Sequence, residues 1–65
     1  MALLSQFSPE VRAQALAKKS VHNAQNVAYQ IMEEAPGTPM EEAAIARADK
    51  VAVAACNMVV KQAAQ

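Results

Sequence analysis

The stretch Ala35-Pro36-Gly37-Thr38-Pro39-Met40-Glu41 divides the 65-residue chain into two arms of similar length. Its first proline and its glycine interrupt any helix that arrives from the N-terminal side. Thr38 then offers an N-cap hydroxyl, Pro39 suits the first helical position, and Glu41 completes a T-x-x-E capping box. A link as short as residues 36–38 turns the second helix back against the first. This stretch therefore predicts an all-α fold, an antiparallel two-helix hairpin.

Each arm is expected to form one long helix. In the first arm, Ser8 supplies an N-cap hydroxyl, Pro9 follows it, and no further proline or glycine comes before Pro36. The second arm contains no helix breaker after Pro39. We therefore expect a single domain, residues 1–65, made of an N-terminal arm at 1–8, a helix at 9–35, a turn at 36–38 and a second helix at 39–64.

The expected first helix is amphipathic. At 100° per residue its apolar side chains fall within an arc of about 140°, and polar side chains fill the opposite arc. The apolar arc contains Ala13, Ala17, Val21, Ala24, Val27, Ala28, Ile31, Met32 and Ala35. The face of the second helix expected to meet it contains Ile45, Ala48, Ala52, Ala55, Cys56, Val59 and Ala63.

The second helix has more apolar surface than one partner helix can cover. Residues 51–60 hold nine apolar side chains and one Asn, a composition typical of a helix buried on most sides. The chain also falls below the roughly 70–80 residues at which a single core suffices. We therefore expect homo-oligomerisation into a helical bundle with the second helix at its centre. The side chains left for further packing are Val51, Val53, Met58 and Val60 on the flanks, and Leu3, Leu4 and Phe7 in the N-terminal arm.

The residues offer little support for enzymatic chemistry. The chain has one His, one Cys, no glycine-rich phosphate loop and no H-E-x-x-H motif. Cys56 lies in an apolar run without a neighbouring cation, so we interpret it as a small buried hydrophobe with a reduced thiol, which favours a cytoplasmic location. Asn57 either fixes the register between subunits or lines a ligand cavity. We expect neither catalysis nor a cofactor or metal.

Polar side chains on the outward arc of the first helix form the candidate binding site. Lys19, His22, Asn26, Tyr29 and Glu33 follow one another at spacings of three and four residues, which places them on one helix face, here called the polar stripe. A cation, an imidazole, an amide and a phenol could hold a phosphate, hydrogen-bond a base or ribose, and stack on a ring. The alternative is an ordinary solvated helix face.

Three further cations could add phosphate contacts. Lys18 precedes the polar stripe, whereas Arg47 and Lys50 lie three residues apart on the second helix, beside that face or within reach of a neighbouring subunit. The alternative for Arg47 and Lys50 is ion pairing with nearby carboxylates, where each exposed pair is worth about 0–1 kcal/mol. The predicted ligand-binding set is therefore Lys18, Lys19, His22, Asn26, Tyr29, Arg47 and Lys50.

A polar helix, a proline-containing link and a small-residue helix follow one another over residues 18–62. The last of these begins Met40-Glu-Glu-Ala-Ala-Ile-Ala-Arg-Ala-Asp-Lys-Val-Ala-Val-Ala-Ala-Cys. In architecture and small-residue rhythm this segment resembles the helical-hairpin sponge proteins by which phages sequester the cyclic nucleotide signals of bacterial CBASS and Thoeris defence. The resemblance implies hairpins that oligomerise and bind ligands non-covalently in pockets between subunits. It assigns no binding residue.

The leading hypothesis is a non-catalytic, oligomeric small-ligand-binding protein, a phage immune-evasion sponge that holds a small anionic nucleotide at subunit interfaces. One alternative is an RNA-binding four-helix-bundle dimer resembling plasmid copy-control proteins, although a net charge of zero argues against nucleic acid. That dimer would bind through Arg12, Lys18, Lys19 and Lys61. Another alternative is a structural protein–protein interaction module that offers its apolar flanks to a partner helix. We expect no membrane association and no secretory signal, because no apolar run is long enough for either.

Overall fold

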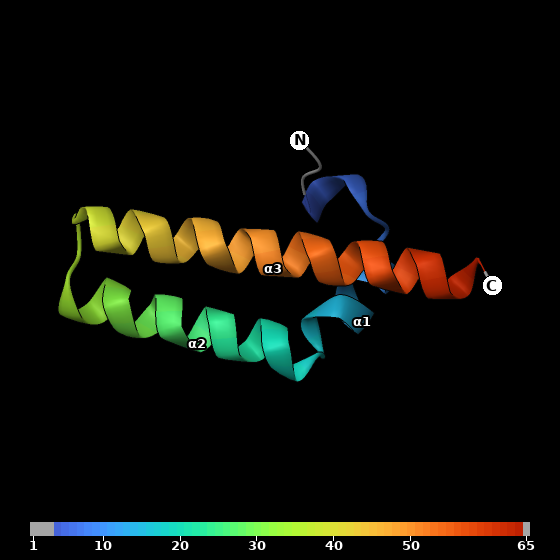
Figure 1. Cartoon of the computed structure of the whole chain (residues 1–65), viewed down its shortest axis with the longest axis horizontal. Coiled ribbons are helices and arrows are strands. Elements are labelled where there is room, and N and C mark those ends of the chain that lie inside the picture. Colours follow the sequence, from blue (N-terminus) through green and yellow to red (C-terminus); the bar gives the residue numbers. More distant parts are fainter. Residues whose placement is uncertain (1–3, 65) are drawn as a thin grey trace.

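The structure is a computed structural model that describes residues 4–64, and all regular secondary structure in this range is helical. Figure 1 shows the order of the elements along the chain. The all-α prediction is confirmed for these residues. The part of the predicted N-terminal arm that contains Leu3 lies outside them. The elements are the 3-10 helix η1 (Leu4–Gln6) and the α-helices α1 (Pro9–Leu16), α2 (Lys19–Glu34) and α3 (Pro39–Ala63).

Both predicted N-caps are present. The Ser8 hydroxyl accepts a hydrogen bond from the backbone N–H of Val11 at 3.3 Å. The Thr38 hydroxyl accepts one from the backbone N–H of Glu41, also at 3.3 Å. Because each hydroxyl satisfies a donor that has no partner within its helix, α1 and α3 begin where the sequence predicts.

The turn between α2 and α3 is held together by hydrogen bonds from both sides. The Thr38 hydroxyl donates to the carbonyl of Ala35 at 2.6 Å. The Glu41 carboxylate accepts from the backbone N–H of Gly37 at 3.2 Å, one residue earlier than the Thr38 N–H of an ideal capping box. Gly37 has a φ of 74°, a left-handed conformation that glycine adopts without steric cost. Hydrogen bonds between residues at most four positions apart therefore fix the conformation of the turn.

The expected single helix over residues 9–35 is wrong, because the chain breaks it into α1 and α2. Ala17 is still helical, but Lys18 is extended, with a φ of −71° and a ψ of 139°. Backbone hydrogen bonds continue across the break: the N–H of Lys18 donates to Ala15, and those of Val21 and His22 donate to the Lys18 carbonyl. The bonds around the break do not include one donated by the N–H of Lys19 or Ser20, as is usual for the first residues of a helix, and the break allows α1 to pack on α3.

The core lies where α1, α2 and α3 meet. In Figure 1, α2 and α3 lie side by side and are joined at one end by the turn, whereas α1 packs near the C-terminal half of α3. The interpretation of Cys56 as a buried hydrophobe is confirmed, since its side chain is fully buried and unpaired. The buried cluster contains Ala15, Val21, Ala52, Ala55, Cys56 and Val59, and Leu4, Phe7, Val11, Leu16 and Val51 pack against it.

The predicted apolar arc of the first arm is buried along α2 but not along α1. Ala13 and the C-cap residue Ala17 are exposed and Ala15 is buried instead, because the break at Lys18 gives α1 a different orientation from α2. Val21, Ala24 and Ala28 are buried. Val27 and Met32, at opposite edges, remain 41% and 40% exposed.

On α3, Met58 and Val60 are also exposed, whereas Val51 and Val53 are half-buried and Val51 packs on the core. The single chain therefore covers part of the flanks that the sequence assigned to further subunits.

Replacing Thr38 tests the turn. Thr38→Ala removes the hydroxyl that joins the turn to α3, and it should lower the free energy of unfolding by about 1 kcal/mol. Thr38→Ser keeps the hydroxyl and should stay close to the parent. Urea denaturation at one fixed protein concentration measures both variants. Equal stability of Thr38→Ala and the parent would contradict the role of this cap.

Replacing Lys18 tests the helix break. Lys18 occupies the N-cap of α2 without a side-chain cap, so Lys18→Ser should raise the free energy of unfolding by about 0.5–1 kcal/mol through a new hydrogen bond to the first turn. If residues 9–35 formed one continuous helix, Lys18→Ser would instead lower the free energy of unfolding by about 0.3 kcal/mol. Lys19→Ser, one residue inside α2, is the matched control and should be slightly destabilising. Thermal denaturation shows whether each variant is more or less stable than the parent. A lower stability of Lys18→Ser would contradict the break.

Candidate binding site

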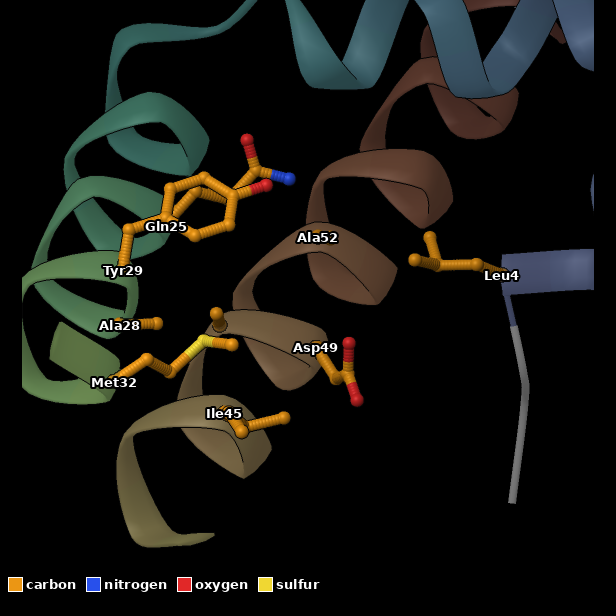
Figure 2. A pocket seen from close by; sticks show the side chains of 9 residues that line it. Leu4, Gln25, Ala28, Tyr29, Met32, Ile45, Asp49 and Ala52 are labelled. Atoms are coloured by element: carbon orange, nitrogen blue, oxygen red, sulfur yellow. The ribbon is translucent and has the colours of Figure 1, made fainter. Parts of the chain in front are cut away.

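A shallow groove of about 200 Å³ lies over the N-terminal half of α3. Figure 2 shows α2 on one side of it and Leu4 of η1 on the other. The same face of α3 is covered farther along by η1 and α1, which pack on the core near Cys56 and Val59. The groove is therefore the part of this face that the N-terminal elements leave open. Its lining residues are Leu4, Gln25, Ala28, Tyr29, Met32, Ile45, Ala48, Asp49 and Ala52.

Helical spacing explains why these side chains meet. The four lining residues of α2 and the four of α3 each follow the same pattern of i, i+3, i+4 and i+7, which defines one helix face. The two sets face each other across the groove in opposite order, so Gln25 lies near the Ala52 end of the α3 set and Met32 lies near its Ile45 end. Alanines form the deepest positions: Ala28 is 5% and Ala52 2% exposed. Small residues in the floor and larger ones at the rim produce the hollow.

The lining is mostly apolar and carries three polar groups. These are the Tyr29 phenol, the Gln25 amide and the Asp49 carboxylate. Figure 2 shows Tyr29 beside Gln25 on the α2 wall, Met32 reaching from α2 toward α3, and Asp49 on the side nearer Leu4. Such a surface suits a flat apolar ring that also offers hydrogen-bonding groups at its edge.

Among the residues of the polar stripe, Tyr29 also lines the groove. Lys19, His22 and Asn26 are exposed on α2 but do not line it. At 100° per residue, the polar stripe is centred about 90° around α2 from the groove side. Tyr29 belongs to both surfaces and is 61% exposed. The groove and the polar stripe therefore meet at the Tyr29 ring.

The other three predicted cations are not gathered with the polar stripe. Lys18 sits at the break before α2. Arg47 and Lys50 are exposed on α3, about 150° or more around that helix from the groove-lining side. Neither forms an ion pair with any residue in the described range 4–64. Within one chain, Arg47 and Lys50 thus cannot contribute to a site centred on Tyr29.

The sequence interpretation missed part of the groove. It assigned Met32, Ile45 and Ala48 to helix–helix packing and gave Gln25 no role. A usable signal was present, since the same i, i+3, i+4, i+7 pattern occurs on both helices. What the pattern could not show is where η1 and α1 stop covering α3.

Neither a metal-binding cluster nor a membrane-spanning helix occurs among the described residues 4–64. Between residues 4 and 64, no group of His, Cys, Asp and Glu side chains is placed to bind a metal ion. No helix in the same part of the chain combines the length and the apolar character needed to cross a bilayer.

Arg12 is half-buried, and its Nε atom is enclosed without a hydrogen-bond partner.

Comparison with known proteins found no relative from which a role could be transferred. No protein family, no curated protein sequence and no solved structure matches the chain. The groove and the polar stripe are therefore the basis for any functional conclusion.

Proposed function

We propose that this protein is a non-catalytic, homo-oligomeric binding protein whose ligand combines a flat ring with an anionic group, as nucleotides do. The position of Tyr29 carries this proposal. Its ring stands between an apolar groove that suits a base and a polar stripe that suits a phosphate. The ligand is held and released unchanged, because the surface offers binding groups without an activated nucleophile or a paired acid and base.

Each part of such a ligand has a matching group. A base would stack on Tyr29 and against Met32, and its edge or a ribose hydroxyl would hydrogen-bond to Gln25 or Asp49. His22 lies seven residues before Tyr29, about 10 Å along the helix, and Lys19 lies about 15 Å away. These two side chains are the groups that would contact phosphate. Asp49 would repel a phosphate placed in the groove itself. The base would therefore occupy the groove, and the phosphate would lie toward His22 and Lys19.

The proposed assembly extends the observed helices. An α2–α3 antiparallel hairpin would form the repeating unit of a helical bundle, supported by the short turn that joins these helices at one end. Exposed apolar residues on α3, Met58 and Val60 among them, support homo-oligomerisation. Sequestration of a cyclic nucleotide signal in the cytoplasm, as a phage immune-evasion sponge, is the role that the resemblance to sponge proteins adds to this proposal.

RNA binding is the weaker alternative. It requires an outer face rich in accessible cations, but Arg12 is half-buried, and the net charge of the chain is zero. The absence of a band shift at low salt would remove it. A protein-interaction module remains the alternative favoured by the exposed apolar residues outside the groove, such as Met40 at 63% exposure.

Calorimetric titration tests the ligand class. The assembled protein should release or absorb heat with at least one member of a panel of cyclic dinucleotides, cyclic trinucleotides and ADP-ribose-type signals. Chromatography should then recover the ligand intact. Because the chain has one Tyr and no Trp, binding should also change the fluorescence of Tyr29. No heat with any member, from protein of verified oligomeric state, would refute the proposal.

Substitutions locate the contacts. Tyr29→Ala should weaken binding at least about tenfold, equivalent to roughly 1.4 kcal/mol, because it removes the stacking surface. Tyr29→Phe keeps the ring and should bind within a few-fold of the parent. Lys19→Ala and His22→Ala should each weaken binding, and Lys19→Ala, which removes a positive charge, should also reduce its salt dependence. Lys61→Ala, near the end of α3, is the charge-matched control and should change neither.

A further inference from the structure

The chain is more extended than a compact domain of its size. Its extents are 42 × 23 × 15 Å. The radius of gyration is 12.8 Å, against about 10.7 Å expected for 65 residues. An elongated shape leaves more of the chain open to solvent than a compact one does.

The exposed surface is correspondingly large. A compact monomer of 6.9 kDa exposes about 4000 Å², whereas this chain exposes 4805 Å². The excess of about 800 Å² equals the area that one partner buries in a standard-size protein interface. One further partner of this size would bring the chain to the surface area expected of a compact protein.

The groove is open to solvent on one side, and a second surface placed over it would enclose a cavity. Ligand sites usually enclose about 300–1,000 Å³, and the groove has a volume of about 200 Å³. Two such grooves placed face to face would enclose about 400 Å³, which falls within the usual range. The apolar rim side chains Tyr29, Met32 and Ile45 are 61%, 40% and 38% exposed, so they are available for such a contact.

We infer that a second copy of this chain covers the groove, in a two-fold dimer whose groove faces oppose each other. In a two-fold interface the same patch serves both copies, so Met32 and Ile45 of each chain pack against the equivalent region of the other. The Tyr29 rings of both copies then line one shared cavity. This inference rests on the proposed function for the use of that cavity, but the dimer itself forms without ligand.

Substitution of Ile45 tests this interface in the full-length protein. Wild type should sediment as a particle of twice 6.9 kDa at micromolar concentration. Ile45→Glu places a charge at the centre of the contact in both copies, and it should raise the dimer dissociation constant at least about tenfold. Met32→Lys on the facing helix should do the same. Circular dichroism should show unchanged helix content, because both side chains lie at the surface of the single chain.

Val27→Glu is the matched control. Val27 is 41% exposed on α2, similar to Met32, but it lies about 150° around the helix from the groove side. This variant should remain dimeric. A larger wild-type assembly that Ile45→Glu divides would also support the groove contact. A monomeric wild type would overturn the inference and favour a different protein as the partner. The inference would also be overturned if Val27→Glu dissociated the dimer while Ile45→Glu and Met32→Lys left it intact.

The ligand experiment separates this inference from the proposed function. A dimer that Ile45→Glu dissociates but that binds no nucleotide would keep the interface and refute the ligand class. A monomer that binds nucleotide through Tyr29 would keep the ligand class and refute the interface.

Discussion

The alanine-lined contact between α2 and α3 is the constraint on which the rest of the structure depends. Ala24 and Ala28 on one helix and Ala52 and Ala55 on the other are all buried. Methyl side chains let the two helices approach closely, yet each buries little apolar area, worth about 0.8 kcal/mol per methylene-sized group. The contact is therefore well defined in geometry but modest in energy. Further packing within the chain has to come from its other elements.

Part of that packing comes from the N-terminal elements. Leu4, Phe7, Val11 and Leu16 bring larger side chains onto the core beside the C-terminal half of α3. They end before the N-terminal half, where alanines in the floor and larger residues at the rim leave the groove. Part of the uncovered apolar surface thus coincides with the candidate binding surface. A partner that closes it would stabilise the fold and complete a ligand cavity in one step.

Local signals in the sequence were sufficient for much of the fold. The hydroxyls of Ser8 and Thr38 start helices because an N-cap needs only groups within three residues of it. Helical periodicity identified Val21 and Ala28 as core, since a face follows from spacing alone. The break at Lys18 escaped prediction, because neither proline nor glycine marks it. Packing of α1 against α3 selects the extended conformation there, and it offsets the backbone hydrogen bonds that Lys19 and Ser20 do not donate at the break.

The sequence by itself determined the helical class, the turn at Gly37, the two capped helix starts and the buried face of α2. These depend on interactions between residues a few positions apart, which spacing describes completely. Only the tertiary structure decided that Arg47 and Lys50 lie away from the polar stripe, that Tyr29 joins the polar stripe to a groove, and that α1 leaves half of α3 uncovered. These outcomes depend on how whole helices rotate and cross, which is set by packing between side chains far apart in the chain.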